Sequence, residues 1–280
     1  MEDFLSILSE LIRQEDLEEY EQTIRSLVRG SVVIDPLASS NDQFEIGASK
    51  IGGLPDLIPE MDWPQWEGKP LEFLLQLNLD EIRPFDFPLP TRGLLSFFMS
   101  TELTSPQPSG PGRVLYVEDV SLLQKRLSSP IHTYQTSKPE FVALPSLPYQ
   151  YSTFKGSLWG LESSEIDDFS EAYGAVIYEL EKRLGRMFYR HRLFGYPTPY
   201  QSDVEVEVSY ASRGKKTSGF MTKMGIDDVE DARRWCPLLQ LYGGKDSGLF
   251  DGDAAVYFMF QQQGAPVIDL SEVWTVLDFD

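Results

Sequence analysis

The sequence predicts an α+β fold with largely antiparallel sheets, and three observations support this class. Strand-like runs and helices follow one another without the regular alternation that parallel α/β folds show. Aromatic residues make up 12% of the 280 residues, which supplies enough large apolar surface for a core. One order of motifs also occurs twice, which predicts two related halves within a single domain at 31–280, preceded by a helix at 1–30.

The repeated order is a Gly-x-Pro turn, an apolar strand interrupted by one glutamine, and a strand rich in aromatic residues that follows a glycine. The turns end at Pro55 and Pro197, and the glutamines are Gln76 and Gln240. Turn and glutamine lie further apart in the second copy, and insertions of this kind are typical of surface loops. The repeat predicts an internal duplication, with halves at about 31–130 and 157–280.

Two segments show apolar residues at the helical spacing of three and four. The first covers residues 3–28, has an acidic polar face, and meets a suitable stop at Gly30. We expect this helix to dock on its own domain rather than on a partner. The second begins after an N-cap at Ser163 or Ser164 and ends at Gly185. A short helix is predicted at 120–127.

Strands are predicted from short apolar runs bounded by turn residues. The run at 71–79 is apolar on both faces, which indicates burial on both sides. Residues 204–210 alternate valine or tyrosine with polar residues, which predicts a half-exposed strand. The proline-rich segment 130–156 is the expected boundary between the halves. The remaining predicted strands are at 31–34, 94–99, 113–117, 238–242, 256–260 and 273–279.

The charge balance limits the classes of partner. The chain has 24 basic and 44 acidic side chains, a net charge of −20. Such a chain repels phosphate backbones and anionic lipid surfaces, so we expect neither nucleic acid nor membrane as a partner. The acidity serves solubility, or it attracts a basic protein partner. The oligomeric state stays open.

The cysteine count and the N-terminus predict a cytoplasmic protein. Cys236 is the single cysteine, so no intrachain disulfide can form, which fits a reducing compartment. The N-terminal residues have no basic region of the kind that opens a secretory signal. No apolar run approaches the roughly 20 residues that cross a bilayer.

The sequence has no Walker loop, dinucleotide-binding glycine motif, zinc-protease motif or nucleophile elbow. With two histidines and one cysteine, a multi-histidine metal site is impossible, and we expect no metal and no cofactor. We assign no catalytic residue and favour a non-enzymatic role. Asp246, Asp251 and Asp253 either stabilise turns or form a loop for a hard cation, and turn stabilisation is the favoured interpretation.

The two glutamines give the candidate ligand site. A buried amide in an apolar strand has to be hydrogen-bonded, so each glutamine either ties its strand to nearby backbone or lines a cleft between the two halves. His191 either bonds the adjoining turn, which we favour, or acts as a general base. The full set of candidate ligand-binding residues is Lys50, Gln76, His191, Gln201, Gln240 and Asp253.

A series of motifs covers roughly residues 30–280. They are the segments 49–55, 63–64, 70–79, 93–98, 191–197, 238–241, 252–253 and 273–277, with Gln201 and Asp203. Together they resemble the YwqG-like family, a domain of unknown function (DUF1963). The resemblance implies an internally duplicated α+β domain and no established activity, substrate or cofactor. The chain departs from the family's pattern after Gln240, where Tyr242 to Lys245 intervene.

These observations favour an uncharacterised protein-interaction module. Some bacterial relatives in the YwqG-like family are encoded near polymorphic toxin systems, so the resemblance adds an immunity-like role by analogy. The alternative is a small-molecule-binding protein or a hydrolase-like enzyme that uses a cleft between the halves, with carboxylates and His191 as acid and base.

Overall fold

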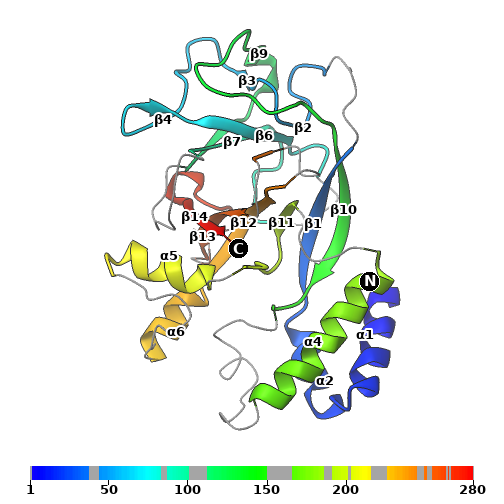
Figure 1. Ribbon diagram of the computed structural model, residues 1–280. Coiled ribbons are helices and arrows are strands. Elements are labelled where there is room, and N and C mark those ends of the chain that lie inside the picture. Colours follow the sequence, from blue (N-terminus) through cyan, green and yellow to red (C-terminus); the bar gives the residue numbers. More distant parts are fainter. Residues whose placement is uncertain are drawn as a thin grey trace.

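The computed structural model shows two antiparallel sheets packed face to face, with two groups of helices at one end (Figure 1). This confirms the predicted α+β class. The described residues are 2–37, 44–82, 87–100, 112–149, 166–185, 191–200, 203–215, 226–244, 249–250, 254–262, 264 and 266–279. Within these ranges, every helix is too short or too polar to span a bilayer.

The larger sheet has six strands in the order β10-β1-β11-β12-β13-β14, and every neighbouring pair is antiparallel. Its strands come from both ends of the chain, which brings β1 between β10 and β11. The bounds are β1 Arg29–Pro36, β10 Pro139–Ser146, β11 His191–Phe194, β12 Trp235–Tyr242, β13 Ala254–Gln261 and β14 Trp274–Phe279.

The smaller sheet has the order β2-β6-β7-β8. Its buried face packs on the larger sheet, where the rings of Phe97 and Phe258 meet edge to face at 5.1 Å. β6 is buried along nearly its whole length, as its apolar sequence predicts. The bounds are β2 Lys50–Ile51, β6 Glu72–Asn78, β7 Leu94–Met99 and β8 Gly112–Val117; two small ribbons pair β3 Asp56–Leu57 with β9 Gln124–Lys125, and β4 Gln65–Trp66 with β5 Lys69–Pro70.

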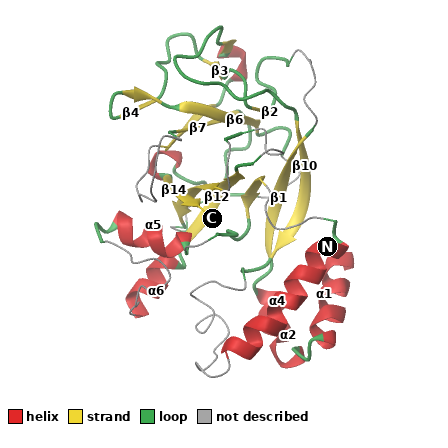
Figure 2. Cartoon of the chain, in the orientation of Figure 1, coloured by secondary structure: helices red, strands yellow, loops and turns green. Residues whose placement is uncertain are grey.

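Three helices form a separate group at the end of β1 (Figure 2). They are α1 Glu2–Gln14, α2 Glu21–Ser26 and α4 Ile166–Arg183. The single helix predicted at 3–28 is wrong, because the chain turns at Asp16, whose φ is 55°, and resumes as the one-turn helix η1 Glu18–Tyr20 and then α2. The predicted stop at Gly30 falls inside β1. The long second helix is confirmed by α4, although Ser163 and Ser164 lie outside the described residues.

Residues 204–210 form a helix and not the predicted strand, which is a correction. The helix is α5 Val204–Ser212, and it packs beside the short helix α6 Ile226–Ala232. Val204 and Val208 face the larger sheet, whereas Val206 and Tyr210 face a second cluster with α6. A helix that is buried on two sides has an apolar residue at every second position, and this alternation imitates a strand.

The boundary between halves at 130–156 stays a prediction. Within it, residues 139–146 form β10, which pairs with β1 over eight residues from Arg29 opposite Ser146 to Pro36 opposite Pro139. This part of the segment packs in the larger sheet. The helix predicted at 120–127 shrinks to one turn, η2 Val120–Leu122, followed by β9; a similar turn, η3 Leu270–Glu272, precedes β14.

Each copy of the repeated motif contains an equivalent hydrogen bond from the turn to the glutamine. The side-chain oxygen Oε1 of Gln76 accepts from the N–H of Asp56, the residue after Pro55, at 2.9 Å. Oε1 of Gln240 accepts from the N–H of Thr198, the residue after Pro197, at 3.3 Å. Each Gly-x-Pro turn is thus held by the glutamine of a buried strand.

The strands that carry the glutamines share a second feature. The pairing of β6 with β7 shifts between Phe73 and Leu75, and that of β12 with β13 shifts between Pro237 and Leu239. Each shift lies just before the glutamine. The duplication of whole halves stays a prediction, because β1 of the first half belongs to the same sheet as the strands of the second.

Replacing Gln76 by alanine is expected to lower the free energy of unfolding by about 3 kcal/mol. Gln76 also donates to the Ala48 carbonyl at 2.8 Å and to Oδ2 of Asp56 at 2.7 Å. The substitution leaves several buried polar groups without partners and opens a cavity. Urea unfolding measures the effect. Gln14→Ala, on the exposed face of α1, should change it by less than about 0.5 kcal/mol; equal midpoints for the two variants would contradict the expectation.

Candidate functional site

Lys50 and Gln76 meet in a closed polar network inside the smaller sheet. They lie opposite each other on β2 and β6. The Nζ atom of Lys50 lies 3.0 Å from Oδ1 of Asp56, and the exposed fractions of these side chains are 3% and 1%. Burial lowers the pKa of Lys50, and the Asp56 carboxylate opposes that shift. The network ties β2, β3 and β6 together.

His191 and Gln240 are buried on the neighbouring strands β11 and β12 of the larger sheet. The ring nitrogen Nδ1 of His191 accepts from the N–H of Tyr242 at 3.1 Å, so this imidazole supports the strand pairing. Gln201 and Asp253 lie outside the described residues, and so do Asp246 and Asp251 of the possible cation loop. The cleft that would join these candidates stays a prediction.

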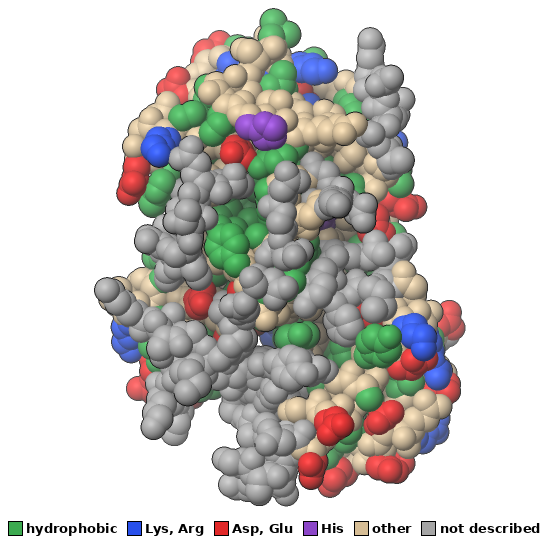
Figure 3. Space-filling view, viewed as in Figure 1, with side chains coloured by type: hydrophobic (Ala, Val, Ile, Leu, Met, Phe, Trp, Pro, Cys, Tyr) green, Lys and Arg blue, Asp and Glu red, His purple; other side chains and the backbone are tan. Residues whose placement is uncertain are grey.

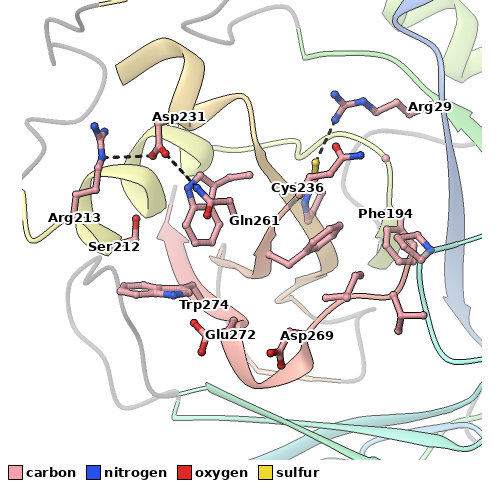
Figure 4. A pocket seen from close by; sticks show the side chains of 18 residues that line it. Arg29, Phe194, Ser212, Arg213, Asp231, Cys236, Gln261, Asp269, Glu272 and Trp274 are labelled. Atoms are coloured by element: carbon pink, nitrogen blue, oxygen red, sulfur yellow. Dashed lines mark hydrogen bonds and ion pairs between the residues drawn. The ribbon is translucent and has the colours of Figure 1, made fainter. Parts of the chain in front are cut away.

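A different region holds a large cavity, with a volume of about 640 Å³ (Figure 4). Its walls come from the end of β11, from α5, α6, β12 and β13, and from the segment that leads through η3 into β14. A hydrogen bond from the N–H of Ile268 to the Pro88 carbonyl, at 2.8 Å, ties that segment to the first half of the chain. None of its lining residues belongs to the set of candidates predicted from the sequence.

Aromatic side chains make up much of the cavity wall. The indoles of Trp235 and Trp274 meet edge to face at 6.2 Å, and the rings of Phe194 and Phe260 meet in the same way at 6.1 Å. Phe194 has a φ of 55°, which is uncommon for a residue with a side chain. The φ of Gly195 is 81°, and a Cβ atom there would lie 2.9 Å from Ser146 and Ser31, so only glycine fits this turn.

One polar group of the cavity is fully paired. Asp231 of α6 accepts from Ser209 at 2.6 Å and from Gln261 at 3.2 Å, and its carboxylate lies 3.4 Å from Nε of Arg213. Figure 4 shows the contacts of the Asp231 carboxylate with Arg213 and Gln261. Nη1 of Arg213 also lies 2.7 Å from Asp228. This network fastens α6 to α5 and to β13 and leaves little charge for a ligand.

The opposite side of the cavity holds a different cation. Arg29, the first residue of β1, lies over the ring of Tyr196 at 4.2 Å. It also donates to Sγ of Cys236 at 3.7 Å, as Figure 4 shows. None of the ion pairs among the described residues involves Arg29. Burial raises the pKa of the Cys236 thiol, with Arg29 opposing the shift, so the thiol is neutral at pH 7.

Arg29 and Trp235 also line a second, small cavity of about 130 Å³. Asp203 and Glu205, at the start of α5, form its acidic wall. Burial raises the pKa of Glu205 well above its ordinary value of 4.5, and the Asp203 carboxyl adds to the shift. The Glu205 carboxyl therefore ionises at a higher pH than a carboxyl group in water. The other lining residues are Pro148, Tyr149, Tyr196, Pro197, Pro199 and Arg233.

A comparison with known families finds a match to one model, the domain of unknown function DUF1963, over residues 49–278. The chain belongs to the DUF1963 family. This confirms the resemblance seen in the motifs, and it brings no assigned activity. No curated protein matches the chain. The DUF1963 region contains every described lining residue of the two cavities except Arg29, which precedes it.

Replacing Glu205 by glutamine is expected to flatten the pH dependence of stability. Because folding raises the pKa of Glu205, its favourable contribution is complete below pH 4.5 and is lost as the pH rises toward the folded pKa. The wild type should therefore lose up to about 1.4 kcal/mol per pH unit relative to Glu205→Gln above that pH. Urea unfolding at several pH values between about 5 and 8 measures the difference.

Asp203→Asn provides the companion measurement. It removes the like charge beside Glu205 but leaves the burial, which is the larger cause of the shift. This variant should lie between the wild type and Glu205→Gln in its pH dependence. Parallel curves for all three proteins would show that Glu205 ionises normally in the fold.

Proposed function

We propose that this DUF1963 protein is a binding protein that takes a small organic ligand in the large cavity. The observation that carries the proposal is the cavity itself. Its volume of about 640 Å³ falls in the range of small-molecule sites, which run from roughly 300 to 1,000 Å³. Aromatic walls with a few polar groups are also the usual composition of such sites.

The lining favours a ligand with a flat apolar body and polar ends. Trp235, Trp274 and Phe260 supply apolar surface for the body. Arg29 offers hydrogen-bond donors to an anionic or accepting group of the ligand. Asp269 and Glu272, which lie across the view from Arg29 in Figure 4, can accept hydrogen bonds from a donor group of the ligand. Arg213 and Asp231 neutralise each other, so they form part of the cavity wall without adding net charge to it.

Binding explains this lining better than catalysis. The nucleophile candidate in the wall is Cys236, and its raised pKa keeps the thiol in its unreactive neutral form. His191, the base of the hydrolase-like alternative, is not among the lining residues and bonds the backbone of Tyr242. The enzyme alternative therefore gains no support from the large cavity.

A protein-interaction role, including an immunity-like one, is the second candidate. The net charge of −20 supports it, because an acidic surface attracts basic partners. Figure 3 shows acidic side chains spread over the visible face, several of them over the group formed by α1, α2 and α4. A partner of this kind would use the outer surface and leave the large cavity free.

A ligand of the large cavity should raise the melting temperature, and Trp274→Ala should abolish the rise. A thermal-shift screen of aromatic acids, amines and amino acids provides the measurement. A compound at 100 times its dissociation constant adds about 2.7 kcal/mol, which is a rise of about 5 °C for a chain of this size. Trp66→Ala is the matched control, because Trp66 lies in the separate β4–β5 ribbon and does not line the large cavity.

The control variant should keep the ligand shift within experimental error. A screen in which no compound raises the melting temperature would contradict the proposal. So would a shift that survives Trp274→Ala unchanged, because the compound would then bind elsewhere.

For the second candidate, the expected result is retention of a basic protein that weakens as salt rises. Charge-driven binding is screened over about 10 Å at 0.1 M salt, so a pull-down at low salt with stepwise elution measures it. A partner that stays bound at high salt would show that contacts other than surface charge hold it. No partner retained at low salt would count against an interaction role.

A further inference from the structure

We propose that α1, α2 and α4 open and close as one unit, and that this motion displaces Arg29 from the wall shared by the two cavities. The motion is a property of the fold and does not require a bound ligand. Three features of the described residues support it: a separate core for the three helices, a short connection from α2 to Arg29, and a hydrogen bond from α4 to the wall of the small cavity.

The three helices have a hydrophobic core of their own, and Figure 2 shows them as a separate group. Among the described residues, its buried members all come from residues 4–24 and from α4, and they include Leu8 and Tyr173. None of them belongs to the cluster that fills the space between the two sheets. Elements that share a core of this kind open together, with a free energy below that of global unfolding.

The joint between this helical group and the larger sheet is not fully packed. A cavity of about 30 Å³ lies there, and its lining includes Phe4 and Leu180 from the helices and Ser146 and Pro197 from the side of the sheet. Side chains around such a void lose the contacts that would fill it. The joint is therefore the place where the helical group is expected to part from the sheet.

The connection from α2 to the cavities is short. Turn hydrogen bonds continue beyond α2, from the N–H of Leu27 to the Ile24 carbonyl at 3.2 Å and from the N–H of Val28 to the Arg25 carbonyl at 3.3 Å. Leu27 and Val28 also pack on the core of the helices. Arg29 follows directly, so no loose residue lies between them to absorb a movement of α2.

The neighbouring strand makes a second connection. Ser146 lies opposite Arg29 at the end of β10, and the next residue, Leu147, packs on the core of the helices. Pro148 then lines the small cavity, and its carbonyl accepts from the buried hydroxyl of Tyr173 on α4 at 2.9 Å. Two adjacent parts of the small cavity's wall are thus tied to the same helical group.

Cys236 reports the motion, because it is the single cysteine of the chain. Arg29 donates to its Sγ atom, and the exposed fraction of Cys236 is 9%. Displacement of Arg29 uncovers the thiol. Burial is the larger cause of the raised pKa of Cys236 and Arg29 opposes it, so the loss of both lowers the pKa and makes the thiol more reactive.

The test is the rate at which the full chain reacts with N-ethylmaleimide in native buffer. Leu8→Ala removes a fully buried side chain from the core of the helices and should speed the labelling of Cys236 by about tenfold or more. Leu95→Ala is the matched control, because Leu95 is equally buried between the sheets, and it should change the rate less than about twofold. Equal acceleration in the two variants would overturn the proposal, because the thiol would then be exposed by global unfolding.

Tyr173→Phe isolates the link from α4 to the small cavity. It keeps the ring in the core of the helices and removes the hydroxyl that bonds Pro148, and it should speed labelling about fivefold. Tyr116→Phe removes a hydroxyl that bonds the Arg92 carbonyl in the smaller sheet, and this control should leave the rate unchanged. An unchanged rate in Tyr173→Phe would overturn the link.

Hydrogen exchange followed by mass spectrometry measures the opening directly. Peptides from α1, α2 and α4 should show a common protection, about tenfold or more below that of β12. Protection of the helices equal to that of β12 would overturn the separate unit. No ligand is added in these experiments, so the Trp274→Ala screen decides the proposed function separately.

Discussion

The need to satisfy a buried side-chain amide determines much of this architecture. Gln240 lies in β12, where the strand is buried over its whole length, and the amide oxygen takes the N–H that follows Pro197. That bond holds the turn formed by Phe194 to Pro197 against the sheet. This turn places the ring of Phe194 in the wall of the large cavity and the ring of Tyr196 under Arg29. The equivalent bond from Gln76 holds the other turn but has a different neighbour, the Lys50–Asp56 pair.

The two glutamine turns show how similar local devices can lead to different sites. The Gln76 amide, the Lys50 ammonium and the Asp56 carboxylate bond one another or nearby backbone, and they join β2, β3 and β6. Around the second turn, the donors of Trp235 and Arg29 are left without carboxylate or carbonyl partners among the described residues. Stability accounts for the first arrangement.

Much of the fold could be predicted from the sequence, because buried strands such as 71–79 show their environment in consecutive apolar residues. The failures have physical causes. Helix α5 is buried on two sides, so its valines alternate as they would in a strand. The strand β10 was not predicted, because it lies in a proline-rich segment and is only half buried. The role of Gln76 could be anticipated as one of two alternatives, since a buried amide requires partners.

The cavities could not be anticipated in this way. Arg29, Asp203 and Trp235 are far apart in the sequence, and none belongs to a motif that indicates binding on its own. The tertiary fold brings them together in the wall of the small cavity. The acidic residues beside Asp203 were a usable signal, but the assignment of that segment to a half-exposed strand placed them in solvent.

Arg29 lies twenty residues before the region shared with the DUF1963 family, which begins at residue 49. The charge that completes both cavities is therefore supplied by the part of the chain that carries α1 and α2. Two relatives with the same pair of sheets need not accept the same ligand if their N-terminal segments differ. In this architecture, the walls of both cavities combine residues of the shared domain with one charge from the segment that precedes it.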